Sequence, residues 1–145
     1  MSYKLSILLP LINETKSLEE TIQVILNQND KEVHEIIIII SDLKTTDESK
    51  LLAKKMKNIY EKVKIITQKK KLLGGALQDG FAYSSGTHVL LMASDKETEP
   101  NDVKNFITSS KQNLDSIITG NRWISGGGFE SYNYFKYTLN FFFQK

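Results

Sequence analysis

The chain has 145 residues, of which 40% are hydrophobic and 25% are charged, as in an ordinary globular domain. Its 19 basic and 17 acidic residues are interspersed and leave a net charge of only +2, so charge gives no reason to expect a nucleic acid partner. The chain has no cysteine, which excludes disulfides and thiolate metal sites. No apolar run reaches the roughly 18 residues that a membrane span needs.

The first half of the chain predicts two strand and helix pairs. The apolar segment Leu5–Leu9 ends at Pro10, and a helical pattern of apolar residues follows it. Glu35–Ile40 then contains an unbroken run of isoleucines, which is typical of an interior strand covered by helices on both faces. Thr45 and Glu48 predict the N-terminal cap of a second helix.

The second half continues the alternation. Strands are predicted at Val63–Thr67, Val89–Met92 and Ser116–Thr119, with a helix before and after the middle one. Gly80, inside the first of these helices, marks a place where backbone approaches closely, and Pro100 opens the second. Alternation without a hairpin signal predicts a Rossmann-like α/β domain, with a mostly parallel sheet and helices on both faces.

Polar residues follow most of the predicted strands. Right-handed crossovers place all the strand C-termini on one edge of the sheet, where open α/β sheets bind ligands. We therefore expect Pro10 to Glu14, Asp42, Asp95 and Arg122 to share that edge. A carboxylate such as that of Asp95 binds a divalent cation, and the cation neutralises a diphosphate. The alternative is that Asp95 only begins a turn, because turns favour Asp for local reasons.

Several other features allow two interpretations. The basic run at Lys69–Lys71 is either an anion-binding segment or a solvated loop. His34 and His88 have no paired ligands in the sequence, which favours structural roles. After Gly126–Gly128, an aromatic-rich segment predicts a helix from about Tyr132 to the end, with apolar residues on two sides. We expect this helix to contact its own domain, a protein partner or a membrane surface.

The motifs occur in an order that is informative as a whole. That order is Leu8-Leu9-Pro10 with Asn13-Glu14; Glu35 to Asp42 with Thr46-Asp47; Gly74-Gly75-Ala76 with Gly80 and Gly86; Ala93-Ser94-Asp95 with Glu97 to Pro100; and Gly120-Asn121-Arg122-Trp123. In this order the sequence resembles the family 2 glycosyltransferases of GT-A fold, and most closely their dolichyl- or polyprenyl-phosphate sugar transferase branch. The resemblance implies a nucleotide-sugar-binding domain over residues 1–125. Residues 126–145 would then begin an acceptor-side region whose remainder has no counterpart here.

The resemblance also implies roles for individual residues. Asp42 is expected to hydrogen-bond the base, Asp95 to hold Mg²⁺ or Mn²⁺ on the diphosphate, and Arg122 to reach the phosphates. No residue is assigned as the catalytic base. The residues expected to bind the nucleotide sugar are Pro10, Asn13, Glu14, Asp42, Gly74, Gly75, Ser94, Asp95 and Arg122.

The function implied by this resemblance is metal-assisted transfer of a sugar from a nucleoside-diphosphate sugar to a lipid-phosphate or glycan acceptor. The expected location is cytoplasmic, peripherally at the cytoplasmic face of a membrane. The family often has Asp where this chain has Ser41 and Ala93, so the alternative is a truncated or non-catalytic nucleotide-sugar-binding module that acts with a partner. A dinucleotide-dependent oxidoreductase is disfavoured, because Leu9 to Glu14 lacks the glycines that its first turn requires.

Overall fold

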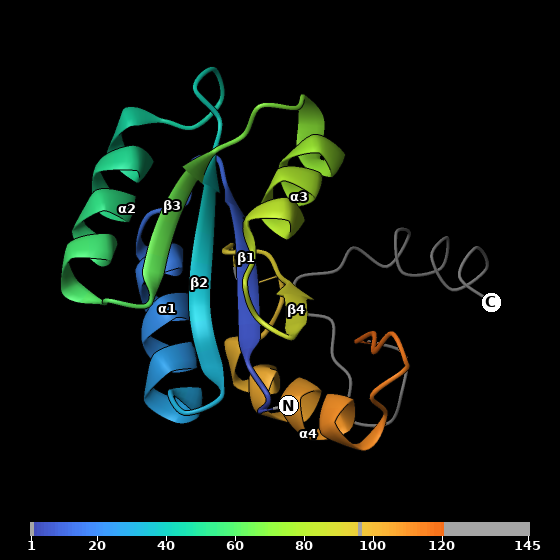
Figure 1. Cartoon of the computed structure of the whole chain (residues 1–145). Coiled ribbons are helices and arrows are strands. Elements are labelled where there is room, and N and C mark those ends of the chain that lie inside the picture. Colours follow the sequence, from blue (N-terminus) through green and yellow to red (C-terminus); the bar gives the residue numbers. More distant parts are fainter. Residues whose placement is uncertain (1, 96, 121–145) are drawn as a thin grey trace, which may run out of the picture.

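The structure, a computed structural model, describes residues 2–95 and 97–120. At its centre is a sheet of four parallel strands in the order β3-β2-β1-β4 (Figure 1). The elements are β1 (Leu5–Leu11), α1 (Lys16–Asn29), β2 (Val33–Ile40), α2 (Asp47–Ile59), β3 (Val63–Thr67), α3 (Leu72–Tyr83), β4 (His88–Leu91), the short 3₁₀ helix η1 (Pro100–Asp102) and α4 (Val103–Gln112).

The sheet is covered on both faces, as the sequence predicts. On one face, residues of α1, α2 and α4 join alternate residues of β1 and β2 in a single buried cluster. On the other face, α3 packs over Leu8, Ile37 and Ile39. Because Ile36 to Ile39 point alternately to the two faces and are all buried, β2 is the interior strand that its run of isoleucines predicts.

Helix α3 lies unusually close to the sheet. A Cβ atom added at Gly80 would lie 2.6 Å from Cδ1 of Ile39 and 2.9 Å from Cδ1 of Leu8. Both of these side chains are buried, so they have little room to move away. This confirms the prediction of a close backbone approach at Gly80 and explains why glycine is needed there.

The first strand is longer than its sequence suggests. We expected it to end at Leu9, whereas β1 continues through Pro10, which pairs with Ile39, to Leu11. The carbonyl of Pro10 accepts a hydrogen bond from Ser94, on the side of β4, and its missing N–H points to the same side. Since β4 pairs with β1 only as far as Leu8, no ladder bond is lost at the proline.

The last predicted strand does not form. Residues 116–119 have no strand structure, and Ile117 is 93% exposed. Within the described ranges the outer edge of β4 has no partner strand, yet residues 116, 117 and 119 are exposed and gain none of the packing that stabilises a strand. The predicted aromatic helix, and the boundary between residues 125 and 126, lie outside the described residues. No helix in the described part of the chain is long and apolar enough to cross a membrane.

A buried carboxylate joins the sheet to the turn after α3, at the edge opposite the strand C-termini. Glu35 is fully buried. Its Oε1 accepts from Ser6 Oγ and from the Ser85 N–H, each at 2.7 Å, and its Oε2 accepts from Lys64 Nζ at 2.7 Å. Burial acts to raise the pKa of Glu35, but the hydrogen bonds from Lys64, Ser85 and Ser6 outweigh it and lower the pKa from 4.5 to about 2.

We expect Gly80→Ala to destabilise the fold by about 1–2 kcal/mol, because overpacking costs more than the better helix propensity of alanine returns. Urea unfolding would measure the change in the free energy of unfolding. Gly74→Ala is the matched control: no atom lies within 4 Å of its added Cβ, so it should be neutral or slightly stabilising. Equal effects at the two glycines would contradict the close packing of α3.

Glu35→Gln should lower the free energy of unfolding by about 3 kcal/mol at pH 7. The pKa of Glu35 is depressed on folding, so its contribution is complete above pH 4.5 and disappears as the pH falls toward 2. Urea titrations at a series of pH values should show wild type and variant converging over that range. The exposed Glu61→Gln is the control, and a difference that persists at pH 2 would contradict the assignment.

Candidate functional site

The loops after β1 and β2 are tied together at the C-terminal edge of the sheet. The buried hydroxyl of Thr45 donates to the Leu11 carbonyl at 2.7 Å and accepts from the Ser41 N–H at 2.7 Å. The next residue, Thr46, donates its N–H to the Ile12 carbonyl at 2.8 Å. One side chain therefore fixes the spacing between two of the loops that carry predicted site residues.

Thr45 has a different role from the one that its position in the sequence predicts. The cap of α2 is Thr46, whose side chain accepts from the Ser49 N–H. Thr45 lies one residue earlier and turns inward between the strand ends. The sequence contains two adjacent threonines, and only their burial shows which one caps the helix and which one joins the loops.

The end of β4 is attached to β1 by a second hydroxyl. Ser94 is 1% exposed, and its Oγ donates to the Pro10 carbonyl at 3.3 Å. Asp95 follows directly and is exposed, with Oδ1 accepting from the Glu97 N–H at 2.9 Å. The structure thus brings Pro10, Ser94 and Asp95 to one place. Asp95 both begins a turn and is exposed to solvent.

Glu14 shapes the loop after β1. Its Oε2 accepts hydrogen bonds from the N–H groups of Ile12 at 2.7 Å and Asn13 at 3.0 Å. The carboxylate is therefore turned back on its own backbone, while Asn13 is exposed. This geometry leaves Asn13 as the polar side chain of the loop that is open to a ligand.

Asp42 lies in the loop after β2 with its side chain exposed. Its backbone carbonyl accepts from Lys50 Nζ of α2 at 3.2 Å, which attaches the loop to the helix behind it. The carboxylate itself has no hydrogen-bond partner among the described residues. It is free to accept hydrogen bonds from a ligand at this edge.

The two candidate glycines lie in the first turn of α3. Gly74 faces open space, whereas a Cβ at Gly75 would lie 2.6 Å from the backbone carbon of Lys70. Gly75 is therefore required by the approach of the segment before the helix. Gly74 has no such internal reason to be glycine, and the space beside it is accessible to another molecule.

The metal-binding capacity of this edge depends on Asp95. In the described part of the chain there is no group of three or more His, Cys, Asp or Glu side chains that could hold a metal ion. Mg²⁺ at phosphate-transfer sites is usually held by one or two carboxylates together with substrate phosphates. An exposed Asp95 fits this requirement when a diphosphate supplies the other ligands.

The structure therefore places most of the predicted residues at one edge. Arg122 lies outside the described residues. Sequence reasoning missed the role of Thr45 as the link between loops, and it missed Asp79, which binds the basic segment before α3. A threonine between two strand ends is a weak signal, and nothing in the sequence distinguishes Asp79 from other acids on exposed helix faces.

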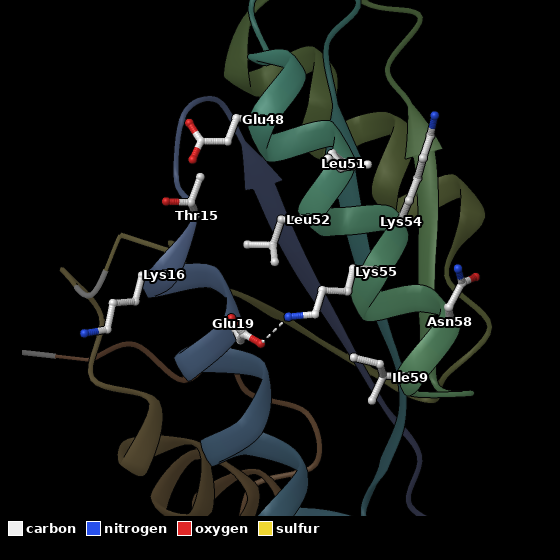
Figure 2. Close-up of a pocket in the computed structure, with 10 residues that line it drawn as sticks. All are labelled: Thr15, Lys16, Glu19, Glu48, Leu51, Leu52, Lys54, Lys55, Asn58 and Ile59. Carbon is white, nitrogen blue, oxygen red and sulfur yellow. Dashed lines mark hydrogen bonds and ion pairs between the residues drawn. The ribbon is translucent and has the colours of Figure 1, made fainter.

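A separate groove lies on the helical face between α1 and α2 (Figure 2). Glu19 of α1 and Lys55 of α2 point toward one another across it and form an ion pair at 3.2 Å. Leu51 and Ile59 line the α2 side and are exposed. None of the predicted site residues lines this groove, so it is a different feature from the edge of the sheet.

Comparison with known proteins agrees with this fold. The family model described as glycosyl transferase family 2 matches residues 6–145. A dolichol-phosphate mannosyltransferase from Pyrococcus furiosus is 29% identical over 134 residues, which is 92% of this chain and 37% of the relative.

The fold is also found among solved structures. It resembles glucosyl-3-phosphoglycerate synthase from Mycobacterium tuberculosis, a protein crystallised with Mn²⁺, UDP and phosphoglyceric acid, with a TM-score of 0.61 and 21% identity. The match covers 77% of this chain and 40% of that one. The chain thus spans about two fifths of the length of the proteins it matches.

We expect Thr45→Val to lower the free energy of unfolding by about 1–3 kcal/mol, because it leaves the Leu11 carbonyl and the Ser41 N–H without a partner. Urea unfolding measures the loss, and amide hydrogen exchange should accelerate at Ser41. Thr108→Val, on the exposed side of α4, is the control. Unchanged exchange at Ser41 would show that the hydroxyl does not hold the loops together.

Proposed function

Because this chain belongs to glycosyl transferase family 2, we propose that it binds a nucleoside-diphosphate sugar at the C-terminal edge of its sheet. It would then supply the donor half of an enzyme that transfers the sugar to a lipid-phosphate or glycan acceptor. The observation that carries this proposal is the meeting of the loops after β1, β2 and β4 through Thr45 and Ser94, with Asp95 exposed beside them.

The chemistry of glycosyl transfer explains why a carboxylate is needed at this place. Negative charge develops on the departing diphosphate, and a site that stabilises this charge accelerates the reaction. A bound Mg²⁺ or Mn²⁺ would supply that stabilisation. In this chain Asp95 would hold the cation, Ser94 would fix the strand end that carries Asp95, and Asp42 would accept hydrogen bonds from the base.

The identity of the ligands is inferred from similar proteins. The glucosyl-3-phosphoglycerate synthase structure contains Mn²⁺ and UDP, which supports a metal and a nucleoside diphosphate. The Pyrococcus furiosus relative is a dolichol-phosphate mannosyltransferase, which supports a lipid-phosphate acceptor. We infer a lipid-phosphate acceptor for this chain from that relative, and a lipid acceptor in turn implies a location at the cytoplasmic face of a membrane.

The second candidate is a non-catalytic nucleotide-sugar-binding module that acts with a partner. It is favoured by Ser41 and Ala93, which stand where related enzymes often have carboxylates. Such a module would bind the donor and release no product. Assaying donor together with polyprenyl phosphate separates the two candidates, because sugar transfer to the lipid excludes the non-catalytic module.

The first test is calorimetric titration with UDP, GDP and their glucose and mannose conjugates, with and without Mn²⁺. We expect one nucleotide to bind with metal dependence. Asp95→Ala should weaken this binding by about tenfold or more, since even outer-shell partners of a metal contribute about 10- to 100-fold. Asp115→Ala, after α4, is the control. Equal binding by wild type and Asp95→Ala in Mn²⁺ would remove Asp95 from the site.

A further inference from the structure

The segment between β3 and α3 is folded back against the helix that follows it. The carboxylate of Asp79, two turns into α3, accepts from the Lys69 N–H at 2.6 Å and the Lys70 N–H at 2.9 Å through Oδ2. Lys70 Nζ donates to Gln78 Oε1 at 2.8 Å, and Gln68 Nε2 donates to the Lys70 carbonyl at 2.7 Å. Polar contacts to one face of α3 thus determine the path of this basic segment.

Burial of apolar side chains adds little to these polar contacts. Leu72 has a φ of 64°, a left-handed conformation that costs energy in a residue other than glycine. Leu72 and Leu73 are both exposed, so burial of apolar surface does not repay this strain. The two hydrogen bonds that Asp79 accepts from Lys69 and Lys70 are therefore among the polar interactions that favour the fold of residues 68–71. The Lys70 and Lys69 N–H groups also hold the pKa of Asp79 below its usual value.

The segment lies at the same edge as the proposed donor site. The Gln68 N–H donates to the Ile40 carbonyl, so the segment leaves the sheet beside the end of β2 and the loop that carries Asp42. The side chains of Lys69 and Lys71 are exposed and have no ion-pair or hydrogen-bond partner within the described ranges. Two exposed ammonium groups thus belong to a segment at the edge where a diphosphate is expected, and the charge of Lys69 also lowers the pKa of Asp79.

We propose that Asp79 is a positioning residue of the donor site: by binding the N–H groups of Lys69 and Lys70, it holds the side chains of Lys69 and Lys71 where they contact the phosphates of the nucleotide. This inference rests on the proposed function. It assigns the basic run to phosphate binding and not to a solvated loop. Lysine suits this role because its ammonium acts as a point charge toward phosphate.

The direction in which Asp79→Ala changes the affinity for an anion distinguishes a positioning role from a purely electrostatic one. Asp79→Ala removes a negative charge beside two lysines, which by itself would strengthen the binding of an anion. If Asp79 acts by positioning, the same substitution weakens binding instead. A role confined to stability of the fold would change the affinity for a nucleoside and for its diphosphate equally.

The experiment is an NMR titration of the whole chain with UDP, GDP, uridine and guanosine. The buffer contains Mg²⁺ and no Mn²⁺. Asp79→Ala should lower the affinity for the nucleoside diphosphate by about three- to tenfold, leave the nucleoside unchanged, and accelerate hydrogen exchange at the Lys69 and Lys70 amides. Asp79→Glu should restore part of the affinity. Asp115→Ala, which removes the same charge from the exposed segment after α4, should match the wild type.

A double-mutant cycle completes the test. Replacing Lys69 and Lys71 together with alanine should cause a similar loss, and adding Asp79→Ala to that variant should cause almost none, because both changes remove the same contact. Additive losses would overturn the positioning role. If the wild type and Asp79→Ala bind the nucleotide equally well, this inference alone is refuted. If the wild type binds no nucleotide, the proposed function and this inference are both overturned.

Discussion

The burial of β2 on both faces is the constraint on which the rest of the structure depends. Ile36 to Ile39 alternate between the two faces and have almost no exposed surface, so helices must cover both sides of the sheet. Parallel strands joined by helices bring every strand C-terminus to one edge. The helices and strands form the core, so the loops at that edge can carry polar side chains that bind a ligand.

Two buried hydroxyl groups hold the strand ends together at this edge. Thr45 links the ends of β1 and β2, and Ser94 links the end of β4 to β1. Both residues are buried, and their hydrogen bonds are made to backbone atoms, so they fix the loops without presenting charge. Carboxylates are used differently on the two sides of the sheet. Glu35, at the opposite edge, is buried and fully bonded, whereas Asp42 and Asp95 are exposed, which suits one for stability and the others for binding.

The basic segment before α3 shows a third use of a carboxylate. Asp79 binds two backbone N–H groups and supports a strained turn at Leu72, close to Gly74 and Gly75. Gly75 is explained by the Lys70 backbone beneath it, while Gly74 faces open space. Residues in sparsely populated backbone conformations, such as Leu72, cluster at binding and active sites. The proposed positioning role of Asp79 would give the β3 to α3 connection a function in addition to its place in the fold.

The sequence by itself determined the class of the fold, the four strands that form, the close approach at Gly80 and the family, because periodicity, β-branched runs and ordered motifs are local properties of the chain. Tertiary structure alone decided the rest. Pro10 continues β1 because β4 stops short beside it. Ser116 to Thr119 form no strand because most of their side chains stay exposed and gain no packing against the sheet. Thr45 and Asp79 acquire their roles from backbone groups that folding brings near them. Such a hydrogen bond depends on the positions of both groups in the folded chain, and no local sequence pattern encodes those positions.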